Sequence, residues 1–153
     1  MELLELMKKG DDALDLSNIS RQYNKKGAVK NLSLTLSSGQ VTCLLGPSGC
    51  GKTTTLRIAA GVERQDQGQV RICGELISDG KRRHLPPEAR SVGLIFQDFA
   101  LFPHLTILEN VTFGIRSEGS RSELWARGMG LLERVSLSGS YKKYPHMLSG
   151  GEQ

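Results

Sequence analysis

The sequence predicts an α/β fold that combines an antiparallel β part with a helical part. Three observations predict it: alternating apolar positions near the N-terminus, two continuous apolar runs on either side of a glycine-rich loop and a helix, and helical periodicity after residue 98. With 153 residues, a net charge of +4 and 38% hydrophobic residues, the chain has the composition of one globular domain. A disordered polyelectrolyte and a membrane bundle are both excluded.

Four segments have the patterns of β-strands. Apolar and polar residues alternate over 14–19 and over 32–36, which predicts two half-buried antiparallel strands. Residues 41–45 and 91–96 are short apolar runs, which predicts two core strands buried on both faces.

The remaining elements follow from helix and turn signals. Residues 53–60 predict a helix that ends at Gly61, and residues 68–74 predict a further strand between turns. Between residues 99 and 146 the spacing becomes helical, which indicates a helical subdomain. The apolar face of its main helix is expected to contain Leu124, Gly128, Leu131 and Val135, with Trp125 and Leu132 alongside.

The glycine-rich loop carries the strongest chemical signal. Residues 46–53 fit the pattern G-x-x-x-x-G-K-[ST] between a predicted strand and a predicted helix, the context of a phosphate-binding P-loop. Backbone N–H groups at a positive helix N-terminus can surround a phosphate, Lys52 can reach the β- and γ-phosphates, and the Thr53 hydroxyl can bind Mg²⁺. The predicted nucleotide-binding residues are Gly46, Pro47, Ser48, Gly49, Cys50, Gly51, Lys52, Thr53 and Thr54.

The loop alone leaves several functions open. A small-molecule kinase, a GTPase and a transport ATPase share this cradle and differ in the residues opposite the γ-phosphate. A chance glycine turn is the non-functional alternative.

Three further motifs narrow this choice. Tyr23 lies upstream of the loop, Gln97 directly follows the second predicted core strand, and residues 148–152 have the sequence LSGGE. Locally, Ser149 and Glu152 also form a helix capping box, and Tyr23 alone could be an ordinary residue at a strand end. Taken in order, these motifs resemble the nucleotide-binding subunits of ABC transporters from about Leu14 to Gln153.

The resemblance implies roles for individual residues. Tyr23 would stack on adenine, Thr53 and Gln97 would bind Mg²⁺, and Lys52, Gln97 and Ser149 would be the catalytic residues. Ser149, Gly150 and Gly151 would contact the γ-phosphate of a second subunit in a head-to-tail dimer.

The resemblance also implies the organisation of the chain. We expect a P-loop NTPase core with an antiparallel β subdomain and a helical subdomain, with the C-terminal part of the core missing. Residues 1–11 would be an N-terminal extension and residues 12–153 a partial ABC ATPase domain. Within that domain, 12–98 would be the nucleotide-binding core and β subdomain, 99–147 the helical subdomain and 148–153 the signature motif.

The family's catalytic glutamate, magnesium-side aspartate and switch histidine would all follow Gln153. We therefore expect the sequence to be a piece of a longer protein that binds nucleotide but hydrolyses it very poorly alone. Unpaired core strands would make the isolated piece unstable or prone to aggregation.

The implied function is that of an ATP-binding, ATP-hydrolysing subunit that energises an ABC importer for a small solute of the ferric iron or polyamine type. Its cofactors would be ATP and Mg²⁺. Its partners would be a second ATPase subunit, transmembrane permease subunits and, indirectly, a solute-binding protein, at the cytoplasmic face of the inner membrane. The scattered basic residues favour no nucleic-acid partner. The alternatives are a soluble ABC protein acting on ribosomes or DNA, a non-hydrolysing nucleotide-binding remnant, and a P-loop kinase.

Two other groups of residues lead to weaker expectations. The phenylalanines 96, 99, 102 and 113 cluster around Gln97, either as core of the helical subdomain or, for Phe99 and Phe102, as part of a groove that receives a helix of the membrane partner. The three cysteines and three histidines have no metal-ligand spacing.

Overall fold

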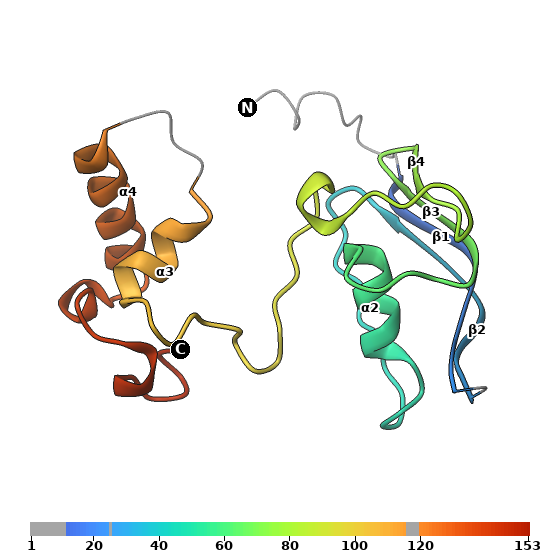
Figure 1. Ribbon diagram of the computed structural model, residues 1–153, viewed down its shortest axis with the longest axis horizontal. Coiled ribbons are helices and arrows are strands. Elements are labelled where there is room, and N and C mark those ends of the chain that lie inside the picture. The colour runs from blue at the N-terminus through green and yellow to red at the C-terminus, as the bar shows by residue number, and fades with distance from the viewer. Residues whose placement is uncertain (1–11, 25, 116–119) are drawn as a thin grey trace. The chain divides into compact units, whose positions relative to one another are not determined.

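The computed structural model describes residues 12–24, 26–115 and 120–153, and the chain divides into two units, residues 1–94 and 95–153 (Figure 1). Each unit is described by itself below. The N-terminal extension expected at residues 1–11 lies outside the described residues. The subdomain boundaries expected after residues 98 and 147 remain predictions.

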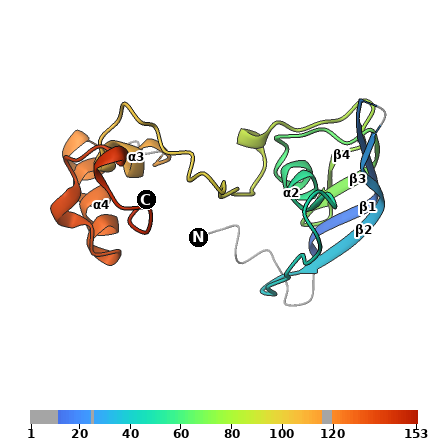
Figure 2. The ribbon, with the colours of Figure 1, turned by 90° about the horizontal axis from the view of Figure 1, so that it is seen from below.

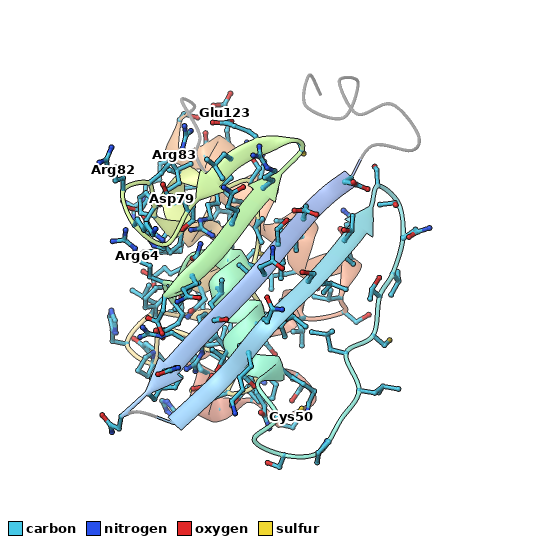
Figure 3. All side chains as sticks on the ribbon, turned by 90° about the vertical axis from the view of Figure 1, so that its right-hand side faces the viewer. Cys50, Arg64, Asp79, Arg82, Arg83 and Glu123 are labelled. Atoms are coloured by element: carbon cyan, nitrogen blue, oxygen red, sulfur yellow. The ribbon has the colours of Figure 1, made fainter. Side chains whose placement is uncertain are left out.

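The first unit is built on a four-stranded antiparallel sheet, which Figure 3 shows face on. Its strands are β1 (Asp12–Tyr23), β2 (Lys26–Ser37), β3 (Gln67–Ile72) and β4 (Glu75–Ser78), in the order β2-β1-β3-β4. The antiparallel pairing of β1 with β2 confirms the prediction from their alternating sequences.

Helix α2 (Lys52–Ala60) lies against one face of this sheet (Figures 1 and 2). Ile58 and Ala59 on the helix pack against Leu16, Ile19 and Val70 of the sheet in one buried cluster. Three consecutive threonines at its start are poor helix formers, so packing of the apolar face stabilises the helix more than propensity does.

The C-terminus of α2 is fixed by a glycine and a buried arginine. Gly61 adopts the left-handed conformation (φ 83°) and its N–H donates to the Ile58 carbonyl, as predicted. Arg90 is only 6% exposed, and its Nη1 donates to the carbonyls of Ile58 and Ala59, both at 2.9 Å. The guanidinium therefore satisfies carbonyls that the helix end leaves without intrahelical partners.

Two predicted elements are wrong. Residues 41–45 and 91–96 are not strands, and Val41, Leu45 and Ile95 are more than 90% exposed. A strand buried on both faces obtains its hydrogen bonds from strands on either side. Within the described residues, the named strands pair with one another and neither run has such a neighbour.

The second unit contains the helices α3 (Ile107–Phe113) and α4 (Arg121–Arg134). Each begins with a complete capping box, formed by Thr106 with Glu109 and by Ser120 with Glu123. Short 3₁₀ turns follow at Ser138–Ser140 (η2) and Pro145–Met147 (η3), and a turn of the same kind, Pro87–Ala89 (η1), lies in the first unit.

The buried face of α4 differs from the predicted one. Gly128 and Leu132 are buried, whereas Leu131 and Val135 are exposed. A Cβ at Gly128 would lie 2.5 Å from Cγ2 of Thr112, so α3 approaches α4 at this glycine. The contact turns the Gly128 and Leu132 side of α4 inward, where Leu132 packs with a cluster completed by Ile107 and Leu148.

Across the ranges that the structure describes, no helix is both long and apolar enough to cross a membrane.

We predict that Arg90→Ala lowers the free energy of unfolding by about 1–3 kcal/mol, because it removes the guanidinium donor from two buried carbonyls of α2 and leaves the Ile58 carbonyl with only the Gly61 N–H. The exposed Arg82, which projects from the loop after β4 (Figure 3), is the control. Urea unfolding of Arg90→Ala and Arg82→Ala measures the difference, and equal stability of the two variants would contradict the capping role.

Candidate functional site

The glycine-rich loop packs directly on strand β2. Gly51 has φ 98°, and a Cβ there would lie 2.3 Å from the Ala28 carbonyl oxygen and 3.2 Å from Cγ2 of Val29. A residue with a side chain could not occupy this position without moving the loop or the strand. The backbone of the loop is therefore held against β2 where α2 begins.

The N-terminus of α2 is open to an anion. Its N-cap residue is Gly51, which has no side chain to accept a hydrogen bond from the helix, and the first turn contains no acidic residue. The first N–H groups of a helix lack intrahelical partners and carry a partial positive charge. Both properties suit a phosphate group.

Lys52 adds a full positive charge at this helix end. Its Nζ donates to the carbonyl oxygens of Gly46 and Pro47, both at 2.7 Å, and lies 3.6 Å from Sγ of Cys50. The ammonium group is thus directed into the loop, where phosphate oxygens could replace the two carbonyls as acceptors.

A cavity of about 440 Å³ lies beside the contact between the loop and β2 and is lined by residues of the loop and of the start of β2. Figure 3 shows Cys50 in the loop beside this end of the sheet. The cavity is lined by Gly27, Ala28, Val29, Lys30, Leu32, Leu44, Leu45, Gly49, Cys50, Gly51, Lys52 and Thr55.

The expected magnesium ligands offer oxygen atoms. Thr53 is exposed in the first turn of α2, and Gln97 is exposed in a turn of the second unit. No cluster of three or more His, Cys, Asp or Glu residues that could hold a metal occurs in the described ranges. A hydroxyl and a carboxamide are suitable ligands for Mg²⁺, which keeps several waters and binds substrate phosphates.

Tyr23 is the last residue of β1, at the strand end where the sequence places it. Its neighbour Gln22 pairs with Gly27, which lines the cavity, so Tyr23 lies at the same end of the sheet as the loop. The Tyr23 side chain is partly exposed, and the guanidinium of Arg21 lies over its ring.

In the signature motif of the second unit, residues 149–153 are exposed, whereas Leu148 is buried. The Ser149 N–H and hydroxyl both donate to Oε2 of Glu152, at 2.8 and 2.6 Å, which confirms one half of the predicted capping box. These bonds hold the pKa of Glu152 below its ordinary value, the hydroxyl contributing first. The Glu152 N–H donates to the Ser149 carbonyl, and Gly150 and Gly151 have no neighbour within 4 Å of a Cβ position.

The core-packing interpretation of the phenylalanines is wrong for three of them. Phe99, Phe102 and Phe113 are exposed, and the rings of Phe102 and Phe113 pack together with centroids 4.4 Å apart. Asn110 holds the loop backbone of Phe102 through hydrogen bonds to its N–H and its carbonyl. The groove role of Phe99 and Phe102 remains a prediction.

Sequence reasoning missed the ionic cluster beside Tyr23. Arg21 pairs with Glu63 and Asp66, two carboxylates that follow α2 in the chain. Residues two apart on a strand face the same side, so the spacing of Arg21 and Tyr23 could have indicated their mutual contact, but no signal in the sequence indicates the two carboxylates.

Comparison with known proteins gives consistent results. A sequence model of the family described as ABC transporter matches residues 29–153. The spermidine/putrescine import ATP-binding protein PotA of Vibrio cholerae is 43% identical over 145 residues, and that of Escherichia coli K12 is 42% identical over 141. These matches cover 94% and 92% of this chain, which spans only 37% and 36% of the length of those relatives.

Solved structures confirm the predicted fold class. The dimeric post-hydrolysis state of the ATP-binding cassette MJ0796 bound to ADP and Pi matches with a TM-score of 0.76 and 29% identity. A second dimeric structure of MJ0796, a bacterial ABC transporter cassette, matches with a TM-score of 0.74 and 28% identity. Each covers 91% of this chain and 64% of the solved chain.

We predict that Gly51→Ala destabilises the protein more than Gly49→Ala does. Both residues are left-handed, which costs a substituted residue about 1–2 kcal/mol. Only Gly51 has a close neighbour, so its variant should lose about 1–3 kcal/mol more through overpacking against β2. Urea unfolding measures both variants, and equal losses would show that the contact with Ala28 is unimportant.

Proposed function

The chain belongs to the ABC transporter family, and on that premise we propose that it is the ATP-binding part of a subunit that energises import of a small solute. The observation that carries the proposal is the placement of Lys52 at an uncapped helix N-terminus beside the cavity. Relatives named as spermidine/putrescine import proteins favour a polyamine over ferric iron as the solute.

The residues of the loop would hold the phosphates of ATP. Lys52 exchanges its two carbonyl partners for β- and γ-phosphate oxygens, while the N–H groups of residues 49–53 donate to the β-phosphate. The hydroxyl of Thr53 and the carboxamide of Gln97 would bind Mg²⁺, which would neutralise phosphate charge. The Tyr23 ring stacks on adenine.

Catalysis in this proposal involves a second copy of the protein. Ser149, with the N–H groups of Gly150 and Gly151, donates to the γ-phosphate held by the loop of the partner in a head-to-tail dimer. The exposure of this segment and the dimeric state of the solved relative support the arrangement. Hydrolysis belongs to the complete protein, in which a base activates the attacking water.

The proposed partners follow from the same premise. They are permease subunits that span the membrane and, indirectly, a solute-binding protein, with the ATPase peripheral to the cytoplasmic face of the inner membrane. The import function named for the relatives supports this assignment. No nucleic acid takes part.

We predict that Lys52→Ala in the full-length protein weakens MgATP binding at least about tenfold, because it removes charge-assisted hydrogen bonds worth about 1.5–3 kcal/mol. Isothermal titration with MgATP measures the affinity. The control is Lys81→Ala, which removes an exposed lysine from the loop after β4. Unchanged affinity in Lys52→Ala would refute the phosphate-binding role.

We predict that Ser149→Ala in the full-length protein leaves MgATP affinity within about twofold but lowers the rate of hydrolysis about a hundredfold, because one donor to the developing charge is lost. Phosphate release at saturating MgATP measures the rate. Ser136→Ala, in the exposed turn after α4, is the matched control. Normal turnover of Ser149→Ala would exclude a catalytic role for this serine.

A further inference from the structure

Arg21 lies against the ring of Tyr23. Its Cζ is 4.9 Å from the ring centroid, within the range of a cation–π contact. The two side chains are two positions apart on β1 and point to the same side of the strand. The guanidinium therefore covers part of one ring face, while 39% of the Tyr23 surface remains exposed.

Two carboxylates fix the guanidinium in this place. Arg21 Nη2 lies 2.5 Å from Oε1 of Glu63, and Nη1 donates to Oδ1 of Asp66 at 2.7 Å. The second oxygen of Asp66 accepts the N–H of Gln22 at 2.8 Å. Burial opposes ionisation of Asp66, but the bonds from Gln22 and Arg21 hold its pKa below the ordinary value, so the pair stays charged near neutral pH.

The same cluster connects Tyr23 to the helix that carries Lys52. Glu63 and Asp66 lie in the segment that leaves α2, where the Glu63 N–H donates to the Arg57 carbonyl and the Asp66 N–H to the Ser20 carbonyl. This segment is thereby joined to β1 beside Arg21. The orientation of the ring is thus set relative to α2, which begins at Lys52.

We propose that Arg21 is a positioning residue that holds the Tyr23 ring ready for the adenine base of ATP. The inference rests on the proposed function, which assigns adenine stacking to Tyr23. A ring that is held before ligand binding loses less conformational freedom when the base stacks on it. Arg21 itself needs no contact with the nucleotide.

The test compares MgATP with magnesium tripolyphosphate, which has the phosphates but no base. In the full-length protein, Arg21→Ala should weaken MgATP binding about two- to tenfold, the cost of ordering one side chain, and leave tripolyphosphate binding unchanged. In a Tyr23→Ala background, removing Arg21 should cause no further loss, because the effect acts through the ring. Isothermal titration measures all affinities.

The control is Arg83→Ala. Arg83 pairs at 2.7 Å with Glu75 on β4, at the opposite edge of the sheet from β2, so this variant should change neither affinity. If Arg21→Ala does not fold, Arg21→Lys replaces it, because lysine keeps the charge but loses the planar fork. Arg21→Lys is expected to show the same pattern, with a smaller loss of MgATP affinity.

Equal weakening of both ligands would overturn the inference, since Arg21 would then only support the fold. Unchanged MgATP affinity in the Arg21 variant would overturn it as well. Failure of the proposed function has a different signature, because the unmodified protein would then bind neither ligand or would bind MgATP no better than tripolyphosphate.

Discussion

The packing of α2 on the antiparallel sheet is the contact on which the first unit depends. At its start, Gly51 lies against the Ala28 carbonyl with no room for a side chain, and at its end Arg90 donates to the carbonyls of Ile58 and Ala59. Between these two ends, Ile58 on the apolar face of the helix packs into the core of the unit. Because both ends are fixed, the helix N-terminus holds a constant position beside the cavity.

That position explains how a short loop can become a phosphate site. A glycine N-cap leaves the helix N–H groups without a side-chain acceptor, and Lys52 is held by the loop's own carbonyls. An anion would satisfy the N–H groups and the lysine together. At the C-terminal end of α2, the Arg21 cluster joins the segment that follows the helix to β1 and Tyr23. The two proposed contacts with ATP, through Lys52 and through Tyr23, are thus both connected to α2.

The same local arrangement, a hydroxyl residue hydrogen-bonded to a glutamate three residues later, occurs three times in the second unit. Thr106 with Glu109, Ser120 with Glu123 and Ser149 with Glu152 share the same spacing, and in each pair the glutamate accepts the backbone N–H of the hydroxyl residue. The first two pairs begin helices, whereas the third encloses two exposed glycines, Gly150 and Gly151. Exposed N–H groups at this segment are what the proposed contact with a partner's γ-phosphate requires.

The sequence by itself determined the elements whose signals are local: the pairing of β1 with β2, helix α2 with its glycine end, and the composition of the loop around Lys52. The strands predicted at 41–45 and 91–96 are wrong, because an apolar run forms a buried strand only when neighbouring strands supply its hydrogen bonds. Only tertiary structure decided which side of α4 is buried, since the approach of α3 at Gly128 outweighs helical spacing. Likewise, the contacts of Arg21 and Arg90 join residues far apart in the chain, and no local pattern encodes them.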